Sequence, residues 1–238
     1  MPLPKITTPT YELEVPSLKK KIRYRPFLVK EEKILIIAME SEDSKQIANA
    51  VKTVITNCIL TKGIKVDELA TFDIEYLFLN IRGKSVGETV DVLITCPDDG
   101  MTKVPRTINL DEIEVQVSEN HTRDIKLDDN LTMRMKYPSM NEFVKNNFNP
   151  QGISVTDTFD LISSCIEQVY TEEESWAASD FSKKELNEFI EQLTSTQFKE
   201  IEKFFETMPK LSHTIKIKNP NTEVESEVVL EGLTSFFA

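Results

Sequence analysis

The chain has 238 residues, of which 39% are hydrophobic and 29% are charged, and its net charge is −12 at pH 7. This length is sufficient to bury a sizeable core without disulfide or metal support, and the composition is that of a globular protein rather than a disordered or fibrous one. The negative charge argues against nucleic-acid binding, which needs a basic face, and no apolar run approaches the length of a membrane span.

The first part of the chain predicts a β-hairpin followed by helices. Apolar and charged residues alternate over residues 11–15 and 22–26, with the basic loop SLKKK between them. Apolar residues then recur at spacings of three and four, which predicts three helices. Asp43 is a good N-cap for the second helix. Thr71 is predicted to cap the third helix, and Gly83 is predicted to stop it.

The rest of the chain predicts a β region, a second helical region and a closing hairpin. Short alternating segments separated by turn residues fill residues 88–137. An apolar stripe from Ile162 to Val169 predicts a helix. A capping box at Ser182 opens an acidic helical pair that extends to Met208. The residues from Thr214 onward alternate again and predict a hairpin.

We therefore expect an α+β protein organised in four segments. Residues 1–87 form the N-terminal hairpin and helical unit, and residues 88–137 form the central β section. Residues 138–209 form the second helical unit. Residues 210–238 form a C-terminal hairpin that packs on the central β section.

Charge is distributed unevenly among these segments. Residues 1–30 contain seven Lys or Arg and two Glu, whereas residues 157–206 contain thirteen acidic residues and four Lys. One interpretation is that the two segments orient protein partners by complementary charge. The other is that they are solvated faces of strands and helices.

The stretch LITCPDDGMTKV, residues 93–104, begins like one knuckle of a zinc site. When the Cys-Pro dipeptide at Cys96 is aligned with the Asn-Pro dipeptide at Asn219, the sequences of the central and closing hairpins match in pattern. The chain therefore contains the same strand–turn–strand motif twice. A four-thiolate zinc site needs a Cys-x-x-Cys pair from each turn, but the first turn offers Cys96 and Asp99 and the second offers Asn219 and Thr222. One thiolate does not hold structural zinc. We therefore predict two degenerate knuckles, with a half-buried Cys96, no bound metal and no cofactor.

The sequence offers little for catalysis. The three cysteines are widely separated and suit a reducing cytoplasm, and the first residues lack the apolar core of a secretory signal. A Cys-His site would require Cys96 or Cys165 to meet His121 or His213 in space. The triplet GKS at residues 83–85 resembles the end of a phosphate-binding loop, but it follows a helix rather than a strand. No catalytic residue is predicted.

Several longer stretches together resemble one protein family. They are PFLVKEEKILIIAME (26–40), FDIEYLFLNIRGKSVGE (72–88), KYPSM (136–140), TMPKLSHTIKIKNP (207–220) and VVLEGLTSFFA (228–238). These stretches resemble the baseplate hub subunits of T-even-like contractile-tailed bacteriophages and their cyanophage and marine relatives. Many members carry Cys-Pro-x-Cys-Gly in one or both turns, and this chain departs from that pattern at Asp99, Asn219 and Thr222.

The resemblance implies a structural or assembly component of a phage tail baseplate. Such a protein is assembled in the host cytoplasm, resides in the virion and binds other baseplate or hub proteins without catalysis. The alternatives are a baseplate-assembly chaperone absent from the mature virion and a small metal-dependent hydrolase. No nucleic acid, membrane or small-molecule substrate is expected as a partner.

Four features are candidates for partner binding. They are the basic hairpin tip (Lys19, Lys20, Lys21), the C-terminal apolar residues (Leu233, Phe236, Phe237), the acidic helical pair and Trp176. The hairpin tip suits an acidic partner, and the acidic pair suits a basic ring. The C-terminal residues either pack in the core or insert into a neighbour. Trp176 is either a partner anchor or a cover on the helical core.

Overall fold

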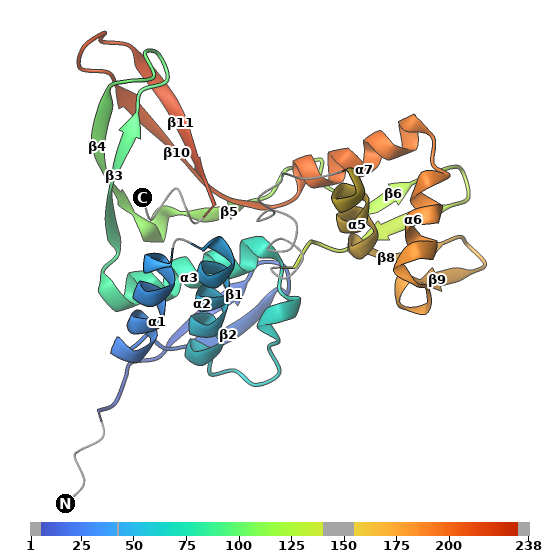
Figure 1. Cartoon of the computed structure of the whole chain (residues 1–238), viewed down its shortest axis with the longest axis horizontal. Coiled ribbons are helices and arrows are strands. Elements are labelled where there is room, and N and C mark those ends of the chain that lie inside the picture. Colours follow the sequence, from blue (N-terminus) through green and yellow to red (C-terminus); the bar gives the residue numbers. More distant parts are fainter. Residues whose placement is uncertain (1–5, 42, 140–154, 233–238) are drawn as a thin grey trace, which may run out of the picture. The chain divides into compact units, whose positions relative to one another are not determined.

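The computed structural model describes residues 6–41, 43–139 and 155–232, and it shows a mixed α+β protein (Figure 1). The described residues form six α-helices and eleven strands arranged in small sheets, which confirms the predicted fold class. The chain divides into two compact units. Unit 1 comprises residues 1–116 and 210–238, and unit 2 comprises residues 117–209. None of the helices in the described ranges is long and apolar enough to span a membrane.

The predicted N-terminal hairpin opens unit 1. Strands β1 (Tyr11–Val15) and β2 (Lys20–Tyr24) pair antiparallel, and their alternation buries Val15, Ile22 and Tyr24. The helices that follow are α1 (Val29–Glu40), α2 (Ser44–Cys58) and α3 (Thr71–Val86), with a short 3-10 turn at Val66–Glu68. Helix α2 begins as predicted, because Asp43 Oδ1 accepts the backbone N–H of Lys45 at 2.8 Å.

Helix α3 differs from the prediction at both ends. Its N-cap is Ala70 rather than Thr71, and the helix continues through Gly83 to Val86. The stop falls at Gly87, whose φ of +128° is a conformation that only glycine adopts without strain. Gly83 and Gly87 could both end this helix, and Gly87 is the one that does. The GKS triplet therefore lies inside the last turns of α3 rather than after the helix.

Two β ribbons share one core in unit 1. In the first, β3 (Thr89–Thr95) pairs with β4 (Lys103–Asn109). In the second, β10 (Lys210–Lys218) lies between β11 (Glu225–Glu231) and β5 (Glu114–Gln116). The buried residues of both ribbons belong to a single cluster with Leu79 of α3 and the 3-10 turn Leu110–Glu112; the cluster contains Val92, Ile94, Cys96, Val104, Ile108, Leu110, Ile113, Leu211 and Ile217.

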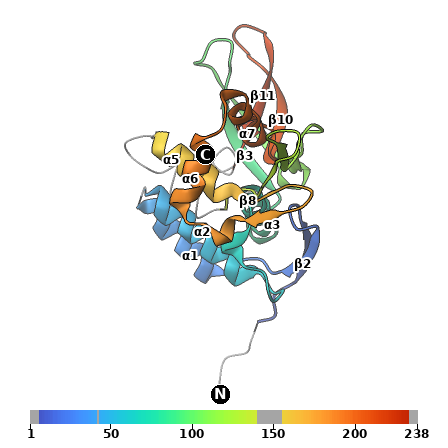
Figure 2. The ribbon, with the colours of Figure 1, turned by 90° about the vertical axis from the view of Figure 1, so that its right-hand side faces the viewer.

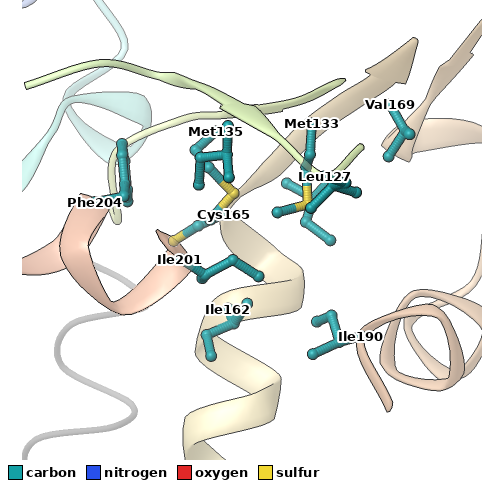
Figure 3. Close-up of a cluster of buried hydrophobic side chains, with 11 residues drawn as sticks. Leu127, Met133, Met135, Ile162, Cys165, Val169, Ile190, Ile201 and Phe204 are labelled. Atoms are coloured by element: carbon teal, nitrogen blue, oxygen red, sulfur yellow. The ribbon is translucent and has the colours of Figure 1, made fainter. Parts of the chain in front are cut away.

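Unit 2 is a four-stranded antiparallel sheet with helices packed against it. The strand order is β6 (Asp124–Lys126), β7 (Thr132–Met135), β8 (Ile166–Tyr170) and β9 (Ser175–Ala177). The helices are α5 (Val155–Cys165), α6 (Lys183–Glu191) and α7 (Ser195–Thr207), with a 3-10 turn at Ala178–Asp180. Figure 3 shows Met133 and Met135 of the sheet above Ile162 and Cys165 of α5, with Ile201 of α7 closing the core.

The predicted helix through Val169 is wrong in its second half. Helix α5 ends at Cys165, and Ile166 begins a strand that pairs with β7. The spacing of three between Ile166 and Val169 fits a helix, but both side chains enter the same sheet-and-helix core from β8. The acidic helical pair is confirmed as α6 and α7. Ser182 caps α6 in a capping box with Glu185, as its sequence predicts.

Candidate functional site: two facing turns and a basic hairpin tip

The two ribbons of unit 1 end in turns of the same backbone design. In the first, the N–H of Gly100 donates to the carbonyl of Cys96 at 2.9 Å; in the second, the N–H of Glu223 donates to the carbonyl of Asn219, also at 2.9 Å. Gly100 and Glu223 both adopt left-handed backbone conformations, with φ of +65° and +62°. Cys96 and Asn219 are therefore equivalent positions, as the internal alignment of the sequence predicts.

The side chains of the two turns meet. The Asn219 amide nitrogen donates to both carboxylate oxygens of Asp98, at 3.1 and 3.0 Å, and to Asp99 Oδ2 at 2.9 Å. The Thr222 hydroxyl also donates to Asp98. Asn219 is 1% exposed, so this amide is buried at the centre of the contact. One neutral side chain thus joins two carboxylates that lie about 120 residues earlier in the chain.

Asp99 also organises its own turn. Its Oδ1 accepts the backbone N–H groups of Met101 at 3.0 Å and Thr102 at 2.9 Å, and its Oδ2 accepts the Thr102 hydroxyl. The Thr102 hydroxyl oxygen in turn accepts from the Asn221 amide at 2.9 Å. Asp99 therefore closes the first turn locally and contacts the second through Asn219.

These hydrogen bonds determine the protonation of the site. The hydroxyl of Thr222 and the amide of Asn219 lower the pKa of Asp98. The Thr102 hydroxyl, helped by backbone N–H groups, holds the pKa of Asp99 far below its usual range. Burial raises the pKa of Cys96, and the neighbouring carboxylates add to that effect. At neutral pH the site holds two carboxylates and a neutral thiol.

The residues present do not fit a structural zinc ion. Such a site needs four ligands, usually thiolates or imidazoles, and the turns supply one thiol that is neutral at pH 7. Cys96 is 1% exposed and packs in the apolar core, so it is fully buried rather than half-buried as expected. The Asn219 amide presents its donor nitrogen to both carboxylates. Within the described ranges, no group of three His, Cys, Asp or Glu side chains is placed to hold a metal.

The basic hairpin tip is anchored at its base. The Ser17 backbone N–H donates to Asp73 Oδ1 at 3.0 Å, and the Ser17 hydroxyl donates to Asp73 Oδ2. Asp73 is 0% exposed and lies in the first turn of α3. Lys19, Lys20 and Lys21 are all exposed next to this anchor, and none forms an ion pair with any described residue. The tip therefore presents three positive charges from a fixed backbone.

The other predicted partner-binding residues are dispersed. Trp176 lies in β9 opposite Val169, and its side chain is 38% exposed to solvent. Leu233, Phe236 and Phe237 lie outside the described residues. Within unit 1, the structure brings together Cys96, Asp99, Asn219 and Thr222.

Sequence reasoning missed the role of Asp98, Thr102 and Asn221 in joining the turns. The available signal was the Asp-Asp-Gly motif, since an Asp at this position accepts backbone N–H groups two and three residues later. Sequence reasoning also missed the environment of His121. Its ring nitrogens lie 3.0 Å from the hydroxyl oxygens of Thr207 and Tyr137 rather than beside a cysteine, and burial lowers its pKa.

The fold and the site define an α+β protein made of short antiparallel ribbons and helices, with its two ribbon tips joined by side-chain hydrogen bonds. Residues 8–238 match the family described as T4 bacteriophage base plate protein, and the chain therefore belongs to that family. The comparisons with curated proteins and with solved structures gave no match.

Membership of this family establishes the setting in which the protein works. The chain is a structural protein of a T4-type phage baseplate, it is located in the virion tail, and it interacts with other baseplate proteins. The surfaces described above are therefore candidates for contacts inside that assembly.

Proposed function

We propose that this chain is a hub subunit of the tail baseplate, which binds other hub and baseplate proteins through preformed surfaces and catalyses no reaction. The observation that carries the proposal is the anchored basic hairpin. Its backbone is tied to the buried Asp73 through Ser17, while Lys19, Lys20 and Lys21 stay exposed. A surface that is already ordered loses little conformational entropy on binding, which favours its use as a docking site.

The charge of the hairpin tip specifies the chemistry of its partner. Three neighbouring lysines attract an acidic protein surface, accelerate encounter and disfavour basic partners. The remainder of the chain is strongly acidic, so the tip is a local exception to a net charge of −12. An acidic face on a neighbouring hub protein is the expected complement, and small-molecule, nucleic-acid and membrane partners play no part in the proposal.

Charge reversal tests the docking role. In a phage carrying Lys19→Glu/Lys20→Glu/Lys21→Glu, we expect the purified variant to fold normally and the yield of complete baseplates to fall at least tenfold. The matched control is Lys45→Glu/Lys62→Glu/Lys103→Glu, which makes the same change in net charge at exposed lysines of unit 1. Equal baseplate yields from both variants would exclude the hairpin as a docking surface.

Residence in the virion tests the hub assignment separately. We expect mass spectrometry of purified virions to find the chain at a fixed copy number, and electron cryomicroscopy of the baseplate to place it at the central axis. Absence from complete virions, with presence in assembly intermediates, would identify an assembly chaperone instead. A peripheral location would overturn the hub assignment while keeping the protein in the baseplate.

A further inference from the structure

Helix α1 is fixed in unit 1 by its inner face. Ala38 is buried, and the carboxylate of Glu31 is 0% exposed. That carboxylate lies 3.1 Å from the guanidinium of Arg25 and accepts the backbone N–H of Leu28 at 2.9 Å. Figures 1 and 2 both show α1 lying beside α2, with which it packs. The opposite side of α1 therefore points away from the core.

The outer face of α1 is apolar and uncovered within the described part of the chain. This outer face comprises four apolar residues and two charged ones: Val29, Lys33, Ile36, Ile37, Met39 and Glu40. Its four large apolar side chains are 79% exposed at Val29, 50% at Ile36, 54% at Ile37 and 60% at Met39. Single exposed apolar residues are normal, but four on one helix of twelve residues form a patch of the kind that marks a protein interface.

Two opposite charges frame this patch. Lys33 and Glu40 are two turns apart and therefore lie on the same side of the helix, with Ile36 between them. Both are exposed, and neither forms an ion pair with a described residue. Lys33 lies in the first half of α1 and Glu40 is its last residue. When the same helix of a second copy lies antiparallel to it, the positive charge of each outer face can therefore meet the negative charge of the other.

We propose that the outer face of α1 binds the same face of a second copy of this chain, with the two helices antiparallel around a two-fold axis. In this register Lys33 faces the partner's Glu40, Glu40 faces the partner's Lys33, and Ile36 faces the partner's Ile37. A two-fold contact is self-complementary, so each ion pair occurs twice. The proposal goes beyond the proposed function, because neither the hairpin tip nor the hub position enters it.

The contact is expected to be weak in isolation. One helix face buries less than the roughly 800 Å² per partner of a standard interface, so we expect a monomer–dimer equilibrium with a Kd of roughly 10–100 μM. In a baseplate, neighbouring proteins hold copies close together, and the raised effective concentration favours the same contact.

Sedimentation equilibrium of the whole purified chain across a wide concentration range tests the proposal. We expect Ile36→Asp to raise the dimer Kd at least tenfold, since it places a carboxylate in the apolar centre. The matched control is Val86→Asp at the end of α3, where the original side chain is 56% exposed, and it should leave the Kd unchanged. Far-UV circular dichroism of each variant verifies folding.

A charge exchange tests the register itself. Lys33→Glu should raise the Kd about three- to tenfold by placing like charges opposite each other, and Lys33→Glu/Glu40→Lys should restore it to within twofold of the original value. A chain that remains monomeric at millimolar concentration, or a double variant as weak as the single one, would overturn the proposal. The proposal would also be overturned if Ile36→Asp left self-association intact and weakened binding to another baseplate protein. That result would assign the outer face to the other protein. Copy number in virions is measured independently, so failure here leaves the hub assignment standing.

Discussion

Asn219 is the buried residue among those that join the two turns, and replacing it with alanine tests how the ribbons are held together. The substitution removes the amide that donates to Asp98 and Asp99 and leaves the backbone N–H of Asn221 without its acceptor. It keeps the apolar core beneath the turns unchanged. The experiment therefore isolates the side-chain contact from hydrophobic packing.

The expected loss follows from the burial of Asn219. Hydrogen bonds to charged groups contribute about 1.5–3 kcal/mol and neutral ones about 1 kcal/mol. Because the two carboxylates lie near the surface and keep other donors, we take the low end and expect Asn219→Ala to reduce the free energy of unfolding of unit 1 by about 2 kcal/mol. For a domain of this size that corresponds to a fall in Tm of roughly 4–8 °C.

Far-UV circular dichroism during thermal and urea unfolding measures this loss. Trp176 is the only tryptophan and lies in unit 2, so its fluorescence supplies a second signal from the other unit. The matched control is Asn221→Ala, which removes one exposed hydrogen bond to Thr102 and should change stability by less than about 0.5 kcal/mol. Equal stability of the Asn219→Ala variant and the unsubstituted chain would refute the assignment of Asn219 as the link.

Three further outcomes are expected at the same site. Hydrogen bonds depress the pKa of Asp99 in the folded state, so its contribution to the free energy of unfolding is present above the unfolded-state pKa of about 4 and is lost as pH falls below that value. Between pH 6 and pH 3, the urea midpoint should therefore fall more steeply for the unsubstituted chain than for Asp99→Asn. Glu223→Gly should raise stability by about 0.5–1 kcal/mol, because it relieves the left-handed backbone strain, while Glu223→Ala should not, and equal Tm values for the two variants would contradict this. The triple substitution of Asp99, Asn219 and Thr222 by Cys should create a four-thiolate site with Cys96 that binds Zn²⁺ or Co²⁺ one to one, as titration of Co²⁺ absorbance would detect; absence of binding would mean that the turns do not face each other.

The hairpins of unit 1 could be predicted because their alternating residues correspond directly to buried and exposed positions. Residues 11–15 and 22–24 show this pattern, and the strands follow it. The equivalence of Cys96 and Asn219 was also available from internal similarity. The contact between Asn219 and Asp98 could not be predicted, because local sequence patterns do not specify which side chains meet across about 120 residues.

Competing local signals account for the errors. Gly83 and Gly87 both suit a helix end, and only the backbone conformation selects the second. The residues from Ile166 to Val169 suit a helix or a strand equally well, and pairing with β7 decides for the strand. The exposure of Ile36 and Ile37 could not be predicted either, since an apolar helix face in a sequence is equally consistent with a core contact and with an uncovered surface.

The central claim is that hydrogen bonds between the turns, together with the shared apolar core, hold the two ribbons of unit 1 without a metal ion. Elemental analysis of the purified chain combined with thermal unfolding in the presence and absence of a chelator tests it most directly. We predict substoichiometric zinc and the same Tm with and without EDTA. One zinc ion per chain, whose removal by EDTA unfolds unit 1, would contradict the account.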